Sequence, residues 1–281
     1  MPVPRNIIGV AAPEPGRGRF GFTFARHVWH GLADAAEEFG QDLLYIGRSS
    51  PDRQLRNGTG YLDIEVDGFV FIAPQMDAPA LRLLFEAGIP FTTVAGQIDL
   101  PYPSFGSDNV GGVRQALTFL RQLGHTKIAH IAGPANFADG AVRERAFRDF
   151  MAEKKMDLPE EYVHRGAFAY ETGASAARSL LRLPERPTAI FAANDMMAYG
   201  AISVAAELGL EVPKDLSVIG FDDEDHSYLF KLPLTTVRQP AAEAAREALK
   251  AVIDLVQGSK EVQGRKLPTD LIVRESTAPI S

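Results

Sequence analysis

The alternation of short apolar runs with helical stretches is the feature that most constrains this fold, and it is clearest between residues 189 and 223. Ala189 to Ala193 is apolar throughout, as expected of a strand buried on both faces of a parallel sheet. Apolar residues then recur at helical spacing from Met197 to Leu208, and Gly209 follows where a helix would end. Leu216 to Phe221 is a second apolar run. The stretch therefore predicts one complete strand, helix, strand unit.

Polar side chains follow both strands of this unit. Asn194 comes directly after the first strand, and Asp222 comes directly after the second. Ligands of open parallel sheets bind beyond the carboxyl ends of the strands, so we expect both residues on one rim. Two plainer interpretations stay open at this point. Asn194 can be a helix cap alone, and Asp222, which has acidic neighbours, can be a solvated turn or a weak cation site.

The same alternation extends along the whole chain. Further strands are expected at Asn6 to Ala11, Asp42 to Ile46, Gly68 to Ile72, Phe91 to Val94, Ser104 to Ser107, Lys127 to Ala132, Leu234 to Val237 and Asp270 to Arg274. Helical spacing fills most of the intervals between them. Repeated units of this kind predict parallel sheets with right-handed crossovers, and so many strands exceed one small sheet. We therefore predict an α/β fold with two sheets in two lobes and a cleft between them.

Composition excludes several classes of protein. A chain of 281 residues with 46% hydrophobic and 23% charged side chains has the profile of a globular protein. It has no run of eighteen apolar residues and no leader-like amino terminus, so we expect a cytoplasmic protein. The absence of cysteine excludes disulfides, thiolate metal sites and cysteine nucleophiles. The net charge of -7 repels a phosphate backbone, so this chain alone is not expected to bind DNA.

Five motifs carry a resemblance to a known family. They are GHTKIAHIAGP (Gly124 to Pro134), FAANDMMAYGA (Phe191 to Ala201), VPKDLSVIGFDD (Val212 to Asp223), PLTTVRQP (Pro233 to Pro240) and VRESTAP (Val273 to Pro279). In this order they resemble the effector-binding core of the LacI/GalR family of transcription regulators. The resemblance implies a periplasmic-binding-protein-like fold of type I, in which three crossovers join two parallel-sheet lobes around a central cleft. It places residues 1–106 plus 240–268 in the amino-terminal lobe, and 107–239 plus 269–281 in the carboxyl-terminal lobe.

Members of this family normally begin with a basic helix-turn-helix module and a hinge helix. The sequence has neither, so it is expected to be a fragment of a longer regulator or a relative without a DNA-reading head, and we favour the fragment. The resemblance implies operator DNA as a partner only through that missing module. We also expect a homodimer, because the helices expected at Ala78 to Ala87 and Pro240 to Gln257 carry more apolar residues than one buried face requires.

The resemblance also implies an effector site in the cleft. Its ten residues are Phe20, Phe22, Phe24, Asp108, Asp139, Arg143, Phe168, Asn194, Asp222 and Gln239. Arg143, Asn194 and Asp222 match polar residues that contact the effector in sugar-responsive members, and Phe168 matches the aromatic residue that packs on the ligand ring. A plainer interpretation of Arg143 is a surface ion pair with Glu144 or Asp149.

The other six residues are placed by the same resemblance. Phe20, Phe22 and Phe24 follow the first strand, where members offer ligand-facing residues, and Gln239 falls at a crossover that faces the cleft. Asp108 matches an acidic contact of purine-responsive members. Those members, however, have Arg and Thr where this chain has Phe137 and Asp139, so a purine effector is disfavoured. With several carboxylates in the cleft, a neutral sugar or polyol is the expected effector, and a sugar phosphate is the second choice.

Two other functions stay as alternatives. A solute-binding protein of a sugar transporter has the same kind of cleft. A dinucleotide enzyme is suggested by the glycine spacing of Gly16, Gly18 and Gly21. In the dinucleotide fingerprint, however, the first glycine ends the strand, whereas Ala12 to Pro15 intervene here. The chain also lacks a nucleophile elbow, so we expect no catalytic residues, no cofactor and no metal.

Overall fold

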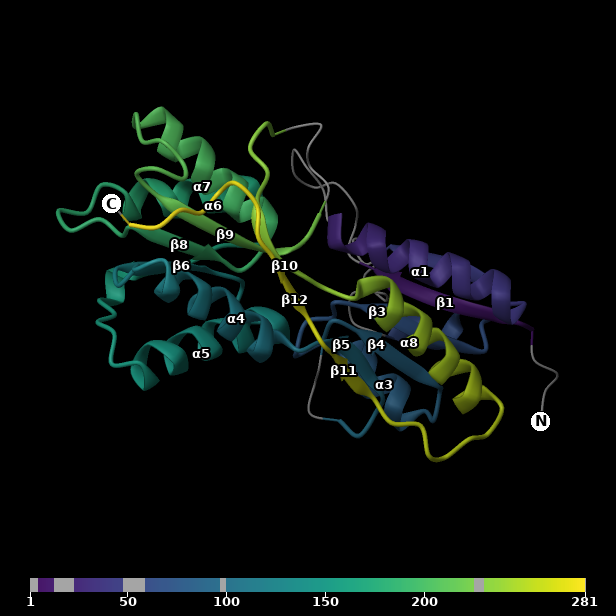
Figure 1. The fold of residues 1–281 in the computed structure, drawn as a ribbon. Coiled ribbons are helices and arrows are strands. Elements are labelled where there is room, and N and C mark those ends of the chain that lie inside the picture. Colours follow the sequence, from purple (N-terminus) through teal and green to yellow (C-terminus); the bar gives the residue numbers. More distant parts are fainter. Residues whose placement is uncertain (1–4, 13–22, 48–58, 97–99, 225–229, 281) are drawn as a thin grey trace.

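The computed structural model describes residues 5–12, 23–47, 59–96, 100–224 and 230–280. Among these residues the strands form two six-stranded sheets, one in each lobe (Figure 1). No helix in the described ranges is long and apolar enough to cross a membrane. The amino-terminal sheet and its helices are called the first lobe below, and the other sheet and its helices are called the second lobe.

The first lobe is built on a parallel sheet with the strand order β11, β5, β4, β3, β1, β2. Its strands are β1 (Ile7–Ala12), β2 (Asp42–Gly47), β3 (Gly68–Ile72), β4 (Phe91–Val94), β5 (Ser104–Ser107) and β11 (Arg265–Leu267). Helices α1 (Thr23–Phe39) and α8 (Ala241–Val256) pack on one face of this sheet. Helix α3 (Pro79–Glu86) and the short helix η1 (Thr59–Asp63) pack on the other face. Both faces are therefore buried, which explains the apolar runs.

The second lobe has the strand order β12, β10, β9, β8, β6, β7. Its strands are β6 (Ile128–Ala132), β7 (Val163–Arg165), β8 (Ala189–Ala192), β9 (Ser217–Asp222), β10 (Thr235–Arg238) and β12 (Asp270–Ile272). Helices α6 (Tyr170–Leu180) and α7 (Asp195–Glu207) pack on one face, and α4 (Asn109–Gln122) and α5 (Ala138–Glu153) pack on the other. A further short helix, η2 (Glu160–Tyr162), precedes β7.

The chain passes between the two sheets three times, after β5, after β10 and between β11 and β12. This topology confirms the predicted fold class of two parallel-sheet lobes joined by three crossovers. The predicted residue boundaries of the lobes stay a prediction. In the unit predicted between residues 189 and 223, β8, α7 and β9 follow in the expected order. Gly209 follows α7 and has a positive φ of 74°, which is typical of the residue that ends a helix.

Three edge strands differ from the expectation. β7 and β11 were not predicted, because each has only three residues and they are mostly polar, such as His164, Arg165 and Lys266. β12 was predicted, but it pairs with β10 in the antiparallel direction and ends at Ile272. Edge strands contact a neighbour on one side only, so they need no continuous apolar run, and hydrophobic patterning does not reveal them.

Candidate functional site

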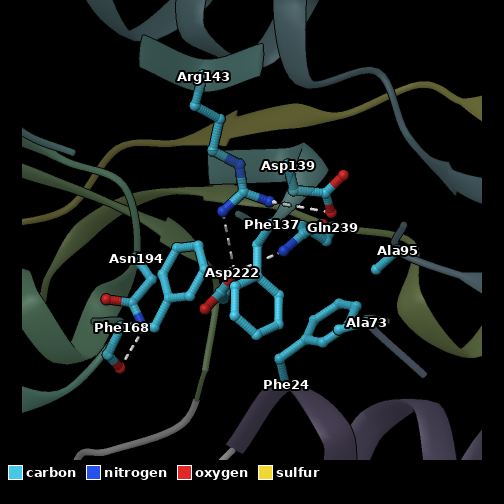
Figure 2. A pocket seen from close by; sticks show the side chains of 10 residues that line it. All are labelled: Phe24, Ala73, Ala95, Phe137, Asp139, Arg143, Phe168, Asn194, Asp222 and Gln239. Atoms are coloured by element: carbon cyan, nitrogen blue, oxygen red, sulfur yellow. Dashed lines mark hydrogen bonds and ion pairs between the residues drawn. The ribbon is translucent and has the colours of Figure 1, made fainter. Parts of the chain in front are cut away.

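A small cavity of about 50 Å³, called the central pocket below, lies between the two lobes (Figure 2). Its lining comes from both lobes and from one crossover: Phe24, Ala73, Ala95, Phe137, Asp139, Arg143, Phe168, Asn194, Asp222 and Gln239. Most of these residues follow the carboxyl ends of strands, where open parallel sheets bind ligands. Three phenylalanines and two alanines make the pocket partly apolar, while two amides and three charged side chains supply polar groups that can orient a ligand.

Seven of the ten predicted site residues line this pocket: Phe24, Asp139, Arg143, Phe168, Asn194, Asp222 and Gln239. Asp108 does not line it, because its carboxylate caps α4 by accepting the Gly111 N–H at 2.9 Å. Phe20 and Phe22 lie outside the described residues. The role of all ten in effector binding stays a prediction.

Three lining residues were missed by sequence reasoning. Ala73 and Ala95 directly follow β3 and β4, so the strand-end rule can find their positions, but alanine carries no chemical signal. Phe137 precedes α5 and lines the pocket next to Phe168, with the two rings nearly perpendicular and their centroids 6.2 Å apart. In the sequence, Phe137 stood out only as a departure from purine-responsive members.

Arg143 is the buried cation at the centre of the site. It is 2% exposed, so the surface ion pair with Glu144 or Asp149 that the sequence left open is wrong. Its Nε donates to Asn109 Oδ1 at 2.7 Å, and its Nη1 donates to the Ala193 carbonyl at 2.6 Å. The guanidinium carbon lies 3.7 Å from the centre of the Phe221 ring. These contacts fix the guanidinium plane while leaving N–H groups directed into the pocket.

Two carboxylates flank this guanidinium at distances too long for hydrogen bonds. Arg143 Nη1 is 3.9 Å from Asp222 Oδ1, and Arg143 Nη2 is 3.9 Å from Asp139 Oδ2. A hydroxyl oxygen placed about 2.8 Å from both partners fits beside each such pair, accepting from the guanidinium and donating to the carboxylate. Burial raises the pKa of Asp139 and of Asp222, although the charge of Arg143 opposes both shifts.

Gln239 links Asp222 to the first lobe. Its Nε2 donates to Asp222 Oδ1, while its Oε1 accepts from Ser107 Oγ at 2.7 Å. Gln239 lies in the crossover between β10 and α8, and Ser107 ends β5 beside another crossover. The amide therefore connects the pocket directly to the segments that must bend when the lobes move.

A second pair of buried carboxylates lies behind Asp222. Asp195 is 1% exposed and accepts from Thr236 Oγ1 at 2.5 Å and from the Glu224 N–H at 2.9 Å. Burial, together with the charge of Asp195, raises the pKa of Glu224 to about 9. Among the described residues there is no cluster of three or more histidine or acidic side chains that could hold a metal ion.

The backbone around the pocket adopts an unusual conformation. Four of its residues have positive φ although they are not glycine: Ala73 (43°), Ala95 (55°), Phe168 (58°) and Asp222 (135°). The described residues include only three others of this kind, Asn6, Lys155 and Asp223, and the last of these is next to Asp222. Such conformations persist where surrounding structure enforces them, and they cluster at binding sites.

Asn194 makes two hydrogen bonds at the rim of the pocket, and one of them is the helix cap that its sequence position suggested. Its Oδ1 accepts the Met197 N–H at 3.0 Å and so caps α7, while its Nδ2 donates to the Phe168 carbonyl at 3.0 Å. We expect Asn194→Asp to retain the cap and to lose the contact with Phe168. The variant should therefore unfold within about 1 kcal/mol of the wild type but show altered proteolysis at Phe168. Asn194→Ala, which removes both bonds, is the comparison, and equal stability of the two variants would contradict this division of roles.

The sequence of this chain is similar to those of known regulators. The family model described as a periplasmic binding protein-like domain matches residues 117–277. The transcriptional regulator CelR of Thermobifida fusca is 33% identical over 277 residues, covering 96% of this chain and 81% of CelR. The transcriptional repressor CytR of Escherichia coli is 36% identical over 220 residues, covering 74% of this chain but only 64% of CytR. The chain thus spans less than two thirds of that relative.

Solved structures of regulators also have a similar fold. A CelR–cellobiose complex matches with a TM-score of 0.89 and 32% identity, covering 97% of this chain and 85% of that one. A regulatory protein of the LacI family from Chloroflexus aggregans matches with a TM-score of 0.86 and 30% identity, covering 97% and 98% of the two chains. These relatives are named as regulators of transcription, not as enzymes.

Proposed function

Because this chain belongs to the LacI family of transcriptional regulators, we propose that it is the effector-sensing core of such a regulator and that its effector is a neutral sugar or polyol. The effector binds in the central pocket, between the lobes. The observation that carries the proposal is the position of Arg143 between Asp139 and Asp222, 3.9 Å from each. Two hydroxyl groups of one ligand fit these two positions, and hydroxyls are what sugars and polyols present in pairs.

The aromatic lining supports the same class of ligand. Phe24 enters from the first lobe, while Phe137 and Phe168 enter from the second (Figure 2). A sugar ring has apolar C–H faces that pack on aromatic rings, and its hydroxyls point outward to polar partners. One relative has been solved with the disaccharide cellobiose, which is a neutral carbohydrate.

Charge argues against an anionic effector. The pocket contains two carboxylates and a single guanidinium, and that guanidinium already serves Asn109 and Ala193. A phosphate in this position adds negative charge beside Asp139 and Asp222 in a buried, weakly screened environment. A sugar phosphate is therefore the second choice.

The transporter alternative is disfavoured by the relatives, which are named as regulators of transcription. As part of a cytoplasmic regulator, the chain converts effector binding into a change in lobe arrangement, because a ligand that contacts both lobes stabilises the arrangement that brings them together. The net charge of -7 disfavours contact between this core and the phosphates of DNA. We therefore propose that the regulator contacts its operator through a separate basic module.

A thermal-shift screen tests the ligand class. Monosaccharides, disaccharides, polyols and sugar phosphates are compared, and a ligand at a hundred times its dissociation constant should add roughly 2.7 kcal/mol of stability. For the best ligand, Asp222→Asn should weaken binding by about 2 kcal/mol, because a neutral amide replaces the charged acceptor of a ligand hydroxyl. The matched control is Asp223→Asn, since Asp223 pairs with Arg238 and Arg274 and does not line the central pocket. Equal affinity of both variants and the wild type would place the site elsewhere.

We also propose that the chain forms a homodimer, but one of the two helices first expected to mediate it does not qualify. The apolar residues of α8, including Leu249 and Val252, are buried in the core of the first lobe. On α3, by contrast, Phe85 is 41% exposed, and the edge strand β2 exposes Leu44 and Tyr45. Contiguous patches of exposed apolar side chains mark interfaces, and we propose that these side chains belong to the contact between the two protomers.

Sedimentation velocity at micromolar concentration should therefore give the mass of a dimer. Phe85→Asp should shift the equilibrium toward the monomer, because it introduces a charge into an apolar contact. Arg145→Asp, which changes an 85% exposed side chain on α5, serves as the control. A wild-type chain that sediments only as a monomer would refute the proposal.

A further inference from the structure

A second cavity, called the side pocket below, adjoins the central pocket and is much larger. It has a volume of about 260 Å³, compared with about 50 Å³ for the central pocket. The first lobe contributes β5 and the segment that enters β11, and the second lobe contributes the first turns of α4 and α5. It is therefore also a space between the lobes, and closure of the cleft changes its shape.

Asp139 joins the two pockets, because it lines both. Asn109, which lines the side pocket, donates from Nδ2 to Asp139 Oδ1 at 3.0 Å and accepts from Arg143 Nε at 2.7 Å. Asp139 thus belongs to the walls of both pockets, and Asn109 connects the side pocket to Arg143. A ligand that reaches Asp139 from the central pocket can extend to the hydrogen-bonding groups of the side pocket.

The lining of the side pocket combines polar groups with apolar surface. The Lys266 ammonium makes no hydrogen bond or ion pair within the described part of the chain, although its charge acts on Asp139, so it can donate to a ligand. Ser104 Oγ donates to the Gly96 carbonyl at 2.6 Å and accepts from Thr93 Oγ1 at 2.9 Å, which leaves one lone pair. Val142 and the Tyr102 ring supply apolar surface. A hydroxylated ring satisfies this combination, whereas an apolar group would leave the polar atoms without partners.

The sizes of the two cavities favour a ligand of two units. At roughly 10–15 Å³ of cavity per water molecule, the central pocket accepts only about four waters and the side pocket about twenty. The central pocket therefore holds the part of a ligand that contacts Arg143, and the side pocket has the volume for a further ring.

We infer that the side pocket is a second sugar subsite and that the effector is a glycoside, with one unit at Arg143 and a second hydroxylated ring beyond Asp139, against Val142 and Lys266. This inference rests on the proposed function, since it extends the same ligand into the neighbouring cavity. Lys266 and Ser104 hold the second ring, and Asp139 contacts both units.

Titration calorimetry with paired ligands tests the inference. The probes are glucose with cellobiose and maltose, galactose with lactose, and glucose 6-phosphate. A disaccharide should bind about tenfold or more tightly than its monosaccharide, because the second ring adds one or two net hydrogen bonds. Val142→Trp fills the side pocket and should abolish this gain while leaving the monosaccharide affinity within about twofold. Lys266→Ala, on the rim, should remove part of the gain without filling the cavity.

Arg145→Trp is the matched control, because it places the same side chain on the exposed face of the same helix. Circular dichroism of each variant confirms folding, and Lys266→Ala keeps the test valid if Val142→Trp is unstable. Disaccharides that bind no better than monosaccharides, or a gain that persists in both side-pocket variants, overturn the inference but leave the proposed function standing. If only glucose 6-phosphate binds more tightly than glucose, and Lys266→Ala removes that difference, the inference of a second sugar ring is overturned and the side pocket binds a phosphate. Absence of binding by every sugar instead overturns the proposed function.

Discussion

Replacing Arg143 with alanine is expected to lower the free energy of unfolding by about 3–5 kcal/mol, because it removes one partner of a buried ionic cluster. The side chain of Asp222 is 7% exposed and that of Asp139 is 21% exposed, so solvent cannot fully replace the lost cation. Asn109 and the Ala193 carbonyl lose a donor at the same time. Urea unfolding at pH 7, followed by circular dichroism, measures the loss.

Two comparisons make this prediction specific. Arg145→Ala, on the same helix, removes an 85% exposed arginine and should change stability by less than about 0.5 kcal/mol. Adding Asp222→Asn to Arg143→Ala should recover part of the loss, because the amide needs no counter-charge. If Arg143→Ala and Arg145→Ala unfold at the same urea concentration, the cluster does not contribute to stability as its burial implies.

The second large effect concerns His130 in the core of the second lobe. Its ring packs nearly parallel to those of Phe147 and Phe191, with centroids 4.7 Å and 5.1 Å away, and its Nδ1 donates to the Phe191 carbonyl at 2.9 Å. Burial is the main cause that lowers its pKa from 6.5 to about 4. The folded protein therefore holds this imidazole neutral at a pH where the unfolded chain protonates it.

The sign of the pH dependence follows from that difference. As the pH falls below 6.5, the unfolded state binds the proton first. The contribution of His130 to the free energy of unfolding is therefore lost until the pH reaches about 4, and it does not change further below that pH. Each pKa unit is worth about 1.36 kcal/mol, so the interval corresponds to a loss of about 3 kcal/mol. The lowered pKa of His125, whose main cause is again burial, contributes to stability with the same sign.

Urea unfolding at several pH values between 4 and 7 tests this expectation. His130→Asn should be less stable at pH 7 and should lose less stability than the wild type as the pH falls. Phe150→Leu is the control, because it weakens the same core without removing a titratable group. The difference between the two profiles isolates His130 from Glu224, whose raised pKa acts in the opposite direction. Parallel profiles for the wild type and His130→Asn would contradict the assignment.

The sequence alone determined the architecture and the edge at which the site lies. Apolar runs of strand length, separated by helical spacing, predicted most strands of both sheets, because strands buried on both faces must be apolar throughout. The positions of Asn194 and Asp222 at strand ends placed them on one rim, since parallel strands bring their carboxyl ends together. The family resemblance added Arg143 and Asp139, which line the same pocket.

Tertiary structure decided what patterning cannot encode. Asp108 and Asn109 are adjacent after β5, yet the first turns back to cap α4 and the second contacts Arg143. Both are short polar residues at a helix start, so only the direction of each side chain in the folded chain separates their roles. The short edge strands β7 and β11 likewise depend on a partner strand rather than on an apolar run.

The lining of the central pocket shows the same limit. Ala73 and Ala95 contribute no chemical group, and they line the pocket because the backbone bends there with positive φ. The sequence also left open whether Arg143 forms a surface ion pair with Glu144 or Asp149. The burial of the Arg143 side chain at the central pocket excludes that pair. A sequence fixes which residues follow which strand, but the distance between residues of different lobes exists only once the crossovers have set the lobes against each other.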